Sequence, residues 1–70
     1  MKKEVSFLVR DLKNMSYGGQ LVEIAHSKNY YFGKMRNIPK ELLNKEIIYI
    51  AAGKSDTDGT PNTLLVDIYE

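Results

Sequence analysis

Hydrophobic and polar positions change their period several times along this 70-residue chain, and each change marks an expected element. Residues 20–26 alternate, with Val22 and Ile24 on one face, which predicts a strand. A short polar reversal at residues 28–29 leads into a second alternating segment, residues 30–36. These two segments are therefore expected to pair as a hairpin.

The second half of the chain predicts another pair of strands. Residues 46–52 predict a strand, because residues 47–50 within it are rich in β-branched side chains and apolar on both faces, which is typical of an interior strand. Residues 63–69 alternate again and predict the last strand. The polar stretch at 53–62 is too long for a minimal turn and is expected to be a loop.

The first segment fits two patterns. One helical face would collect Val5, Leu8, Val9, Leu12 and Met15, whereas Val5, Phe7 and Val9 alternate as a strand would. We favour a helix over residues 9–15, because the polar residues in that run are poor strand formers. Pro39 favours a short helix over residues 40–44, since proline is well suited to a first helical turn.

Together these elements predict one α+β domain over residues 1–70. We expect a small four-stranded, mainly antiparallel sheet of two hairpins, with one N-terminal helix and one short helix between the hairpins. The strand order is left open. The expected core consists of Leu8, Leu12, Val22, Ile24, Leu43, Ile48, Ile50, Leu64, Val66 and Ile68.

Composition narrows the chemistry. The chain has no cysteine, no tryptophan and one histidine, so thiol catalysis, disulfides and cysteine–histidine metal centres are excluded. We therefore expect a protein that is not an enzyme and that uses no catalytic residue, metal or cofactor. A core this small supplies only about 3–5 kcal/mol, which makes a homodimer a further possibility.

Three local motifs are better explained by structure than by chemistry. Gly53-Lys54-Ser55 follows a strand but lacks the upstream glycine and the following helix of a phosphate-binding loop. Residues 56–60 resemble half of a calcium loop, but their glycine stands at the fourth position instead of the sixth, so turn chemistry is expected. His26 has Glu23 as its nearest carboxylate, and alternation places that carboxylate on the opposite strand face.

Charge is unevenly distributed along the chain. Residues 1–45 hold nine basic and four acidic side chains, whereas residues 46–70 hold one basic and five acidic. The protein has a basic side and an acidic side only if the fold keeps the two halves of the chain apart, because interleaved strands would mix the charges. No apolar stretch is long enough for a membrane span, and the N-terminal apolar run is interrupted by Arg10, so a cytoplasmic location without membrane contact is expected.

The strand predicted over residues 30–36 carries the candidate binding surface. Alternation places Tyr30, Phe32, Lys34 and Arg36 on one face. Such a face could anchor a protein partner, or it could stack bases and neutralise phosphates of a nucleic acid. Alternatively, the two aromatic residues belong to the core and the two basic residues are simply solvated.

Three stretches of the chain form a set: Val9-Arg10-Asp11-Leu12, residues 20–24 and above all residues 38–50, where a proline-opened helical turn leads into an apolar strand. In these stretches the chain resembles short, mostly uncharacterised proteins carried by phages and mobile elements of Gram-positive bacteria. The polar stretch before the last strand is longer than is usual in that class. The resemblance implies a binding protein that occupies a host protein, such as a nuclease of a defence system (an anti-CRISPR-like inhibitor), with nucleic-acid binding as the alternative.

Overall fold

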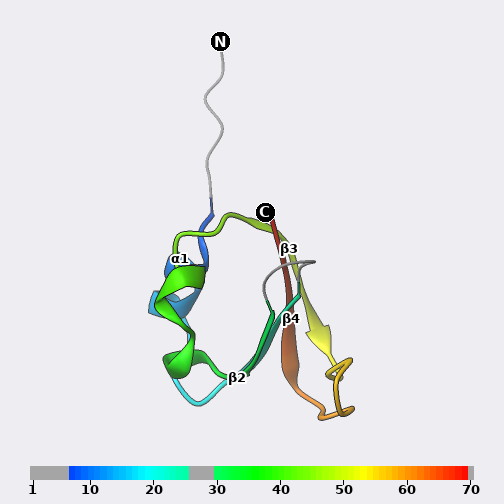
Figure 1. The fold of residues 1–70 in the computed structure, drawn as a ribbon. Coiled ribbons are helices and arrows are strands. Elements are labelled where there is room, and N and C mark those ends of the chain that lie inside the picture. Colours follow the sequence, from blue (N-terminus) through cyan, green and yellow to red (C-terminus); the bar gives the residue numbers. More distant parts are fainter. Residues whose placement is uncertain (1–6, 26–29, 70) are drawn as a thin grey trace.

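The chain forms a small α+β structure in which a helix and two short helical turns cover one face of a four-stranded mixed sheet (Figure 1). The computed structural model describes residues 7–25 and 30–69. The elements in chain order are α1 (Val9–Met15), β1 (Leu21–Ala25), β2 (Tyr30–Lys34), the 3-10 turns η1 (Met35–Asn37) and η2 (Lys40–Leu42), β3 (Ile47–Gly53) and β4 (Thr63–Ile68). None of the helices among these residues is long and apolar enough to cross a membrane.

The strand order is β2-β1-β4-β3. β1 pairs with β2 and β3 pairs with β4, both antiparallel, as the two predicted hairpins require. The two pairs are joined by parallel pairing of β1 with β4, so the sheet is mixed. Strands from the two halves of the chain therefore lie side by side without interleaving.

The helix begins and ends where the pattern predicted, at Val9 and Met15. The Leu8 N–H donates to the Asp11 carboxylate at 3.0 Å, which fixes the first turn. The Val9 and Arg10 N–H groups donate to the carbonyls of Lys45 and Leu43, at 3.0 and 2.9 Å. These bonds tie the start of α1 to the segment before β3. They supply tertiary contacts that a helix of two turns needs to be stable.

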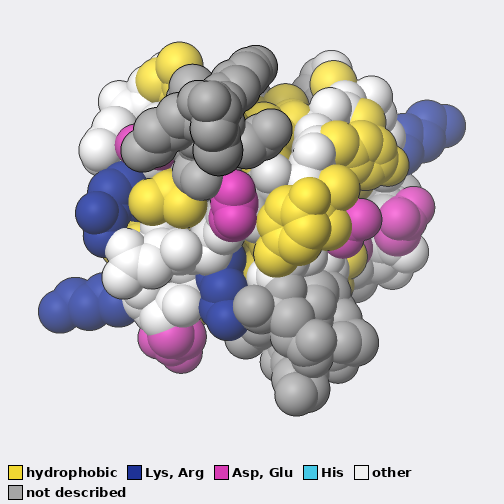
Figure 2. Space-filling model, turned by 90° about the horizontal axis from the view of Figure 1, so that it is seen from above, with side chains coloured by type: hydrophobic (Ala, Val, Ile, Leu, Met, Phe, Trp, Pro, Cys, Tyr) yellow, Lys and Arg dark blue, Asp and Glu magenta, His cyan; other side chains and the backbone are white. Residues whose placement is uncertain are grey.

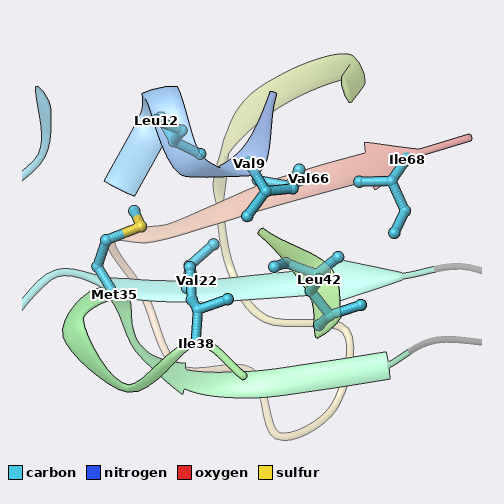
Figure 3. Close-up of a cluster of buried hydrophobic side chains, with 9 residues drawn as sticks. Val9, Leu12, Val22, Met35, Ile38, Leu42, Val66 and Ile68 are labelled. Carbon is cyan, nitrogen blue, oxygen red and sulfur yellow. The ribbon is translucent and has the colours of Figure 1, made fainter. Parts of the chain in front are cut away.

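The core lies between α1, the two 3-10 turns and one face of the sheet (Figure 3). Its buried members are Val9, Leu12, Val22, Ile24, Met35, Ile38, Leu42, Val66 and Ile68. Phe7, Tyr31, Leu43, Ile47 and Leu64 pack against it and are partly buried.

Several core predictions were wrong, and each error has a local cause. Leu8 is half-buried, because it precedes the helix in extended conformation and bridges to Glu46, which leaves Val9 to fill the core. Ile48 and Ile50 are 48% and 36% exposed. β3 is an edge strand and not the interior strand that was predicted, and its register shifts between Ile47 and Tyr49, so Ile47 packs inward in place of Ile48.

The predicted strand 30–36 is shorter than expected. β2 ends at Lys34, and Met35 enters a 3-10 turn with its side chain fully buried. Within β2, Tyr31 lies on the core face and its ring passes over Gly33, where an added Cβ would lie 2.5 Å from the Tyr31 hydroxyl. A side chain at residue 33 would therefore displace the Tyr31 ring. The predicted reversal at residues 28–29 lies outside the described residues.

Candidate functional site

The face of the sheet away from α1 carries the candidate site, and we call it the open face. The register places its side chains between the core residues of each strand. Its members include Glu23, Ala25, Tyr30, Phe32, Lys34, Tyr49, Ala51, Leu65 and Asp67. Within residues 7–25 and 30–69, α1 and the two 3-10 turns lie on the other face, and the loop of residues 54–62 folds back onto part of the open face.

Glu23 is the organising residue of the open face. Its side chain is only 4% exposed, although it is an acid in the middle of a sheet. Oxygen Oε1 accepts hydrogen bonds from the Ser55 hydroxyl and the Asp56 N–H, both at 2.8 Å. Oxygen Oε2 accepts from the Thr57 hydroxyl at 2.6 Å and from the Tyr30 hydroxyl at 3.2 Å. We call these five residues the Glu23 cluster.

Burial and hydrogen bonding act on Glu23 in opposite directions. Burial raises the pKa of its carboxyl group. The bonds from Thr57, Ser55, the Asp56 N–H and Tyr30 favour the charged form and together outweigh burial, so the pKa lies below its usual value. Glu23 is therefore a satisfied carboxylate, and an ionised carboxylate with four donors is a poor proton acceptor.

The loop that reaches Glu23 is itself held by hydrogen bonds. The buried Ser55 hydroxyl accepts from the N–H groups of Thr57 and Asp58, at 3.0 and 3.4 Å. The Asp58 carboxylate accepts from the N–H and hydroxyl of Thr60 at 3.0 and 2.6 Å, which lowers the pKa of Asp58. Gly59 has φ +77°, a conformation that favours glycine. Residues 56–60, which resemble half of a calcium loop, thus form a turn held by hydrogen bonds.

A shallow pocket of about 200 Å³ opens beside the Glu23 cluster. It is lined by Glu23, Ala25, Tyr49, Asp56, Leu65, Val66 and Asp67. Tyr49 and Tyr30 are 57% and 56% exposed, although both come from strands. Seen from above, hydrophobic side chains lie on the surface directly beside acidic ones (Figure 2).

The four residues predicted to bind a partner are only partly brought together. Tyr30 and Phe32 lie on the open face, exposed and half-buried respectively, and Lys34 is exposed at the end of the same strand. Arg36 does not share this face: it lies in η1, its N–H donates to the Gly18 carbonyl at 3.0 Å, and its side chain lies next to Gly18. The predicted placement of Arg36 on this face was wrong, because β2 ends two residues earlier, at Lys34.

Sequence reasoning missed the Glu23 cluster. Alternation did assign Glu23 to the second face of its strand, but no local signal links it to residues more than 30 positions away. The motif Gly53-Lys54-Ser55 is not a phosphate-binding loop by its sequence, and its Ser55 hydroxyl donates to the protein's own Glu23 carboxylate. His26 lies outside the described residues. Among the residues in the ranges 7–25 and 30–69, no group of three or more acidic or histidine side chains could hold a metal ion.

Comparison with known proteins gives no relative: no family model, no curated protein and no solved structure matches this chain.

Proposed function

We propose that this chain is a non-enzymatic binding protein that engages a protein partner with its open face. The observation that carries the proposal is the pair of exposed tyrosines, Tyr30 and Tyr49, beside the shallow pocket on the sheet face opposite α1. Tyrosine supplies much of the binding energy in protein interfaces, because a rigid amphipathic ring buries a large area at low entropic cost.

The Glu23 cluster supports a binding role by making this face rigid. A surface that is ordered before binding loses less conformational entropy when the partner arrives. The same cluster argues against catalysis: the Glu23 carboxylate already has four donors, and the Ser55 hydroxyl is buried and engaged. A nucleophile or a general base needs a free atom that can reach a substrate.

Nucleic-acid binding is the second candidate, and the placement of Tyr30, Phe32 and Lys34 on one face favours it. Charge opposes it, because Asp56 and Asp67 line the adjacent pocket and would repel phosphates. In residues 46–69, which supply β3, β4 and their loop, Lys54 stands against four acidic residues. We therefore favour a protein partner. Its class, a host protein such as a defence nuclease, is supported by the resemblance to phage proteins alone.

Capture of partners from host lysate tests the proposal, with Tyr49→Ala as the decisive variant and Tyr17→Ala as its matched control. Tyr17 is 80% exposed but precedes β1 and lies outside the open face. We expect Tyr49→Ala to lose the captured protein and Tyr17→Ala to retain it, with both variants folded. Retention by Tyr49→Ala would show that the open face is not the binding surface. Capture of nucleic acid that weakens steeply with salt would favour the second candidate.

A further inference from the structure

The outer edge of β3 is a second surface that the open-face proposal leaves unexplained. β3 is the last strand of the sheet, so one row of its backbone N–H and C=O groups points away from β4. Its seven residues include no charged side chain and no proline. Ile48, Tyr49 and Ile50 are 48%, 57% and 36% exposed along this edge.

Such an edge is unusual, since edge strands are normally protected by charges, prolines or a covering segment. The other edge strand, β2, is shorter and ends in Lys34. Among the described residues, β3 is covered only at its start, where the Ile47 N–H donates to the Phe7 carbonyl at 2.8 Å and Leu8 bridges to Glu46. From the bulge to Gly53, no described residue outside β4 pairs with the backbone of β3, so the outward N–H and C=O groups of this stretch are open to another strand.

We infer that this edge pairs with the β3 edge of a second copy of the chain, antiparallel and about a two-fold axis. An uncharged edge fits itself, because a two-fold axis brings like residues together and no like charges would meet along the strands. The interface goes beyond the proposed open-face function and does not depend on it.

The geometry also fixes the register. Directly opposed residues in antiparallel strands point to the same side of the sheet, so the axis passes through a residue that faces itself. Placing Ile50 on the axis would bring Gly53 of the second copy against Ile47, whose outer side is already occupied by Phe7. Placing Ala51 on the axis pairs Tyr49 with Gly53 and leaves Phe7 in place, whereas an axis at Ala52 would pair only residues 51–53 of β3.

This register has a consequence for binding. Because the axis stands perpendicular to the sheet, both open faces lie on the same side of a continuous eight-stranded sheet. The two open faces then point in the same direction, and binding through both raises the avidity for a partner without any new contact. A pairing of five residues in each strand buries less than the about 1,200 Å² of a stable interface, so we expect a dimer that forms with rising concentration.

Sedimentation velocity over a concentration series tests the association, with Ala52→Lys as the disrupting variant. Ala52 is exposed on the edge strand, and a lysine there introduces like charges along the paired strands. We expect the unchanged protein to shift from monomer to dimer and Ala52→Lys to stay monomeric with an unchanged circular dichroism spectrum. Ala25→Lys, which places the same charge on an inner strand, should still dimerise. A monomer at every soluble concentration overturns the inference.

Disulfide trapping tests the register, since the chain contains no other cysteine. Ala51→Cys should give a covalent dimer under mild oxidation, because the two Cβ atoms face each other across the axis. Ala52→Cys is the matched control: it lies next to Ala51, but in this register it faces Ile50 and is too far from its own copy to bridge. Equal trapping of both variants, or preferential trapping of Ala52→Cys, overturns the register.

Salt dependence separates this interface from a contact between charged ends of the molecule. Pairing of β3 edges brings two acidic C-terminal halves together, so added salt should strengthen the dimer by screening their repulsion. Association that weakens with salt would instead indicate that the basic half of one copy meets the acidic half of another, which overturns the edge pairing. If Ala52→Lys still captures the partner while Tyr49→Ala does not, binding of the partner by the open face does not require the dimer, and each proposal is tested by its own variant.

Discussion

The face of the sheet beneath α1 and the open face are stabilised by different interactions, the first by apolar burial and the second by hydrogen bonds to a carboxylate. Under α1, Val22, Ile24 and Val66 are buried among other apolar side chains and need no specific partner atoms. On the open face, Glu23 lies between Val22 and Ile24 in the same strand. Its buried carboxylate is stabilised by four hydrogen-bond donors. The apolar face tolerates small shifts, whereas the polar face works only in one geometry.

This difference suits a division of roles. The apolar face supplies the free energy that keeps a 70-residue chain folded. The Glu23 cluster adds rigidity to the surface that we propose binds a partner, by fixing residues 55–57 to the centre of the sheet. Substitutions on the two faces should therefore differ in kind as well as in size.

The largest effect is expected on the apolar face. Ile24→Ala removes a fully buried side chain and leaves a cavity, which costs about 2–5 kcal/mol. Because a core of this size supplies about 3–5 kcal/mol, the variant should be largely unfolded at 37 °C. Urea unfolding followed by circular dichroism measures the loss, and Ile24→Val is the matched control, with an expected cost of about 0.5–1.5 kcal/mol. A variant as stable as the unchanged chain would contradict the placement of the core.

The second effect separates the two faces. Glu23→Gln keeps the shape of the side chain but replaces charge-assisted bonds with weaker ones, and its amide group would face hydroxyl and N–H donors. We expect a loss of about 2 kcal/mol in the free energy of unfolding, less than for Ile24→Ala. Unlike a core substitution, it should also speed hydrogen exchange of the Asp56 amide, which donates to Glu23.

Glu41→Gln is the control for this substitution, since Glu41 is exposed in η2 and outside the cluster. It should leave both stability and the Asp56 exchange rate unchanged. If Glu23→Gln behaves like Glu41→Gln, the carboxylate does not hold the loop, and the Glu23 cluster is not what makes the open face rigid.

Acid should weaken the polar face selectively. The pKa of Glu23 is lower in the folded chain than its usual value of 4.5, so the unfolded chain takes up the proton first as pH falls. Its contribution to stability is fully present above about pH 4.5 and is lost as pH falls through the folded pKa. Stability measured by urea unfolding should therefore fall less steeply below pH 4.5 in Glu23→Gln than in the unchanged protein. Equal slopes would show that Glu23 titrates normally.

Sequence reasoning succeeded where structure depends on neighbours along the chain. The limits of α1 follow from local pattern, and so does the inward direction of Val22 and Ile24. It failed where the outcome depends on distant contacts. The apolar residues of β3 look the same in an interior or an edge strand until β4 pairs with β1. The bond between Ser55 and Glu23 joins positions 32 residues apart, which no local pattern encodes.

The smallest expected effect tests how much the candidate binding residue Tyr30 contributes to the polar face. Tyr30→Phe removes one donor to Glu23 Oε2, which keeps the Thr57 hydroxyl as a partner, so the carboxylate is not left unsatisfied. We expect a loss of about 0.5–1.5 kcal/mol in the free energy of unfolding, measured by urea. Tyr17→Phe, at an exposed tyrosine outside the cluster, should change nothing. If partner capture survives Tyr30→Phe but not Tyr30→Ala, the ring of Tyr30 binds the partner while its hydroxyl serves the cluster. Loss of capture in Tyr30→Phe would instead mean that the order imposed on the loop is what the partner recognises.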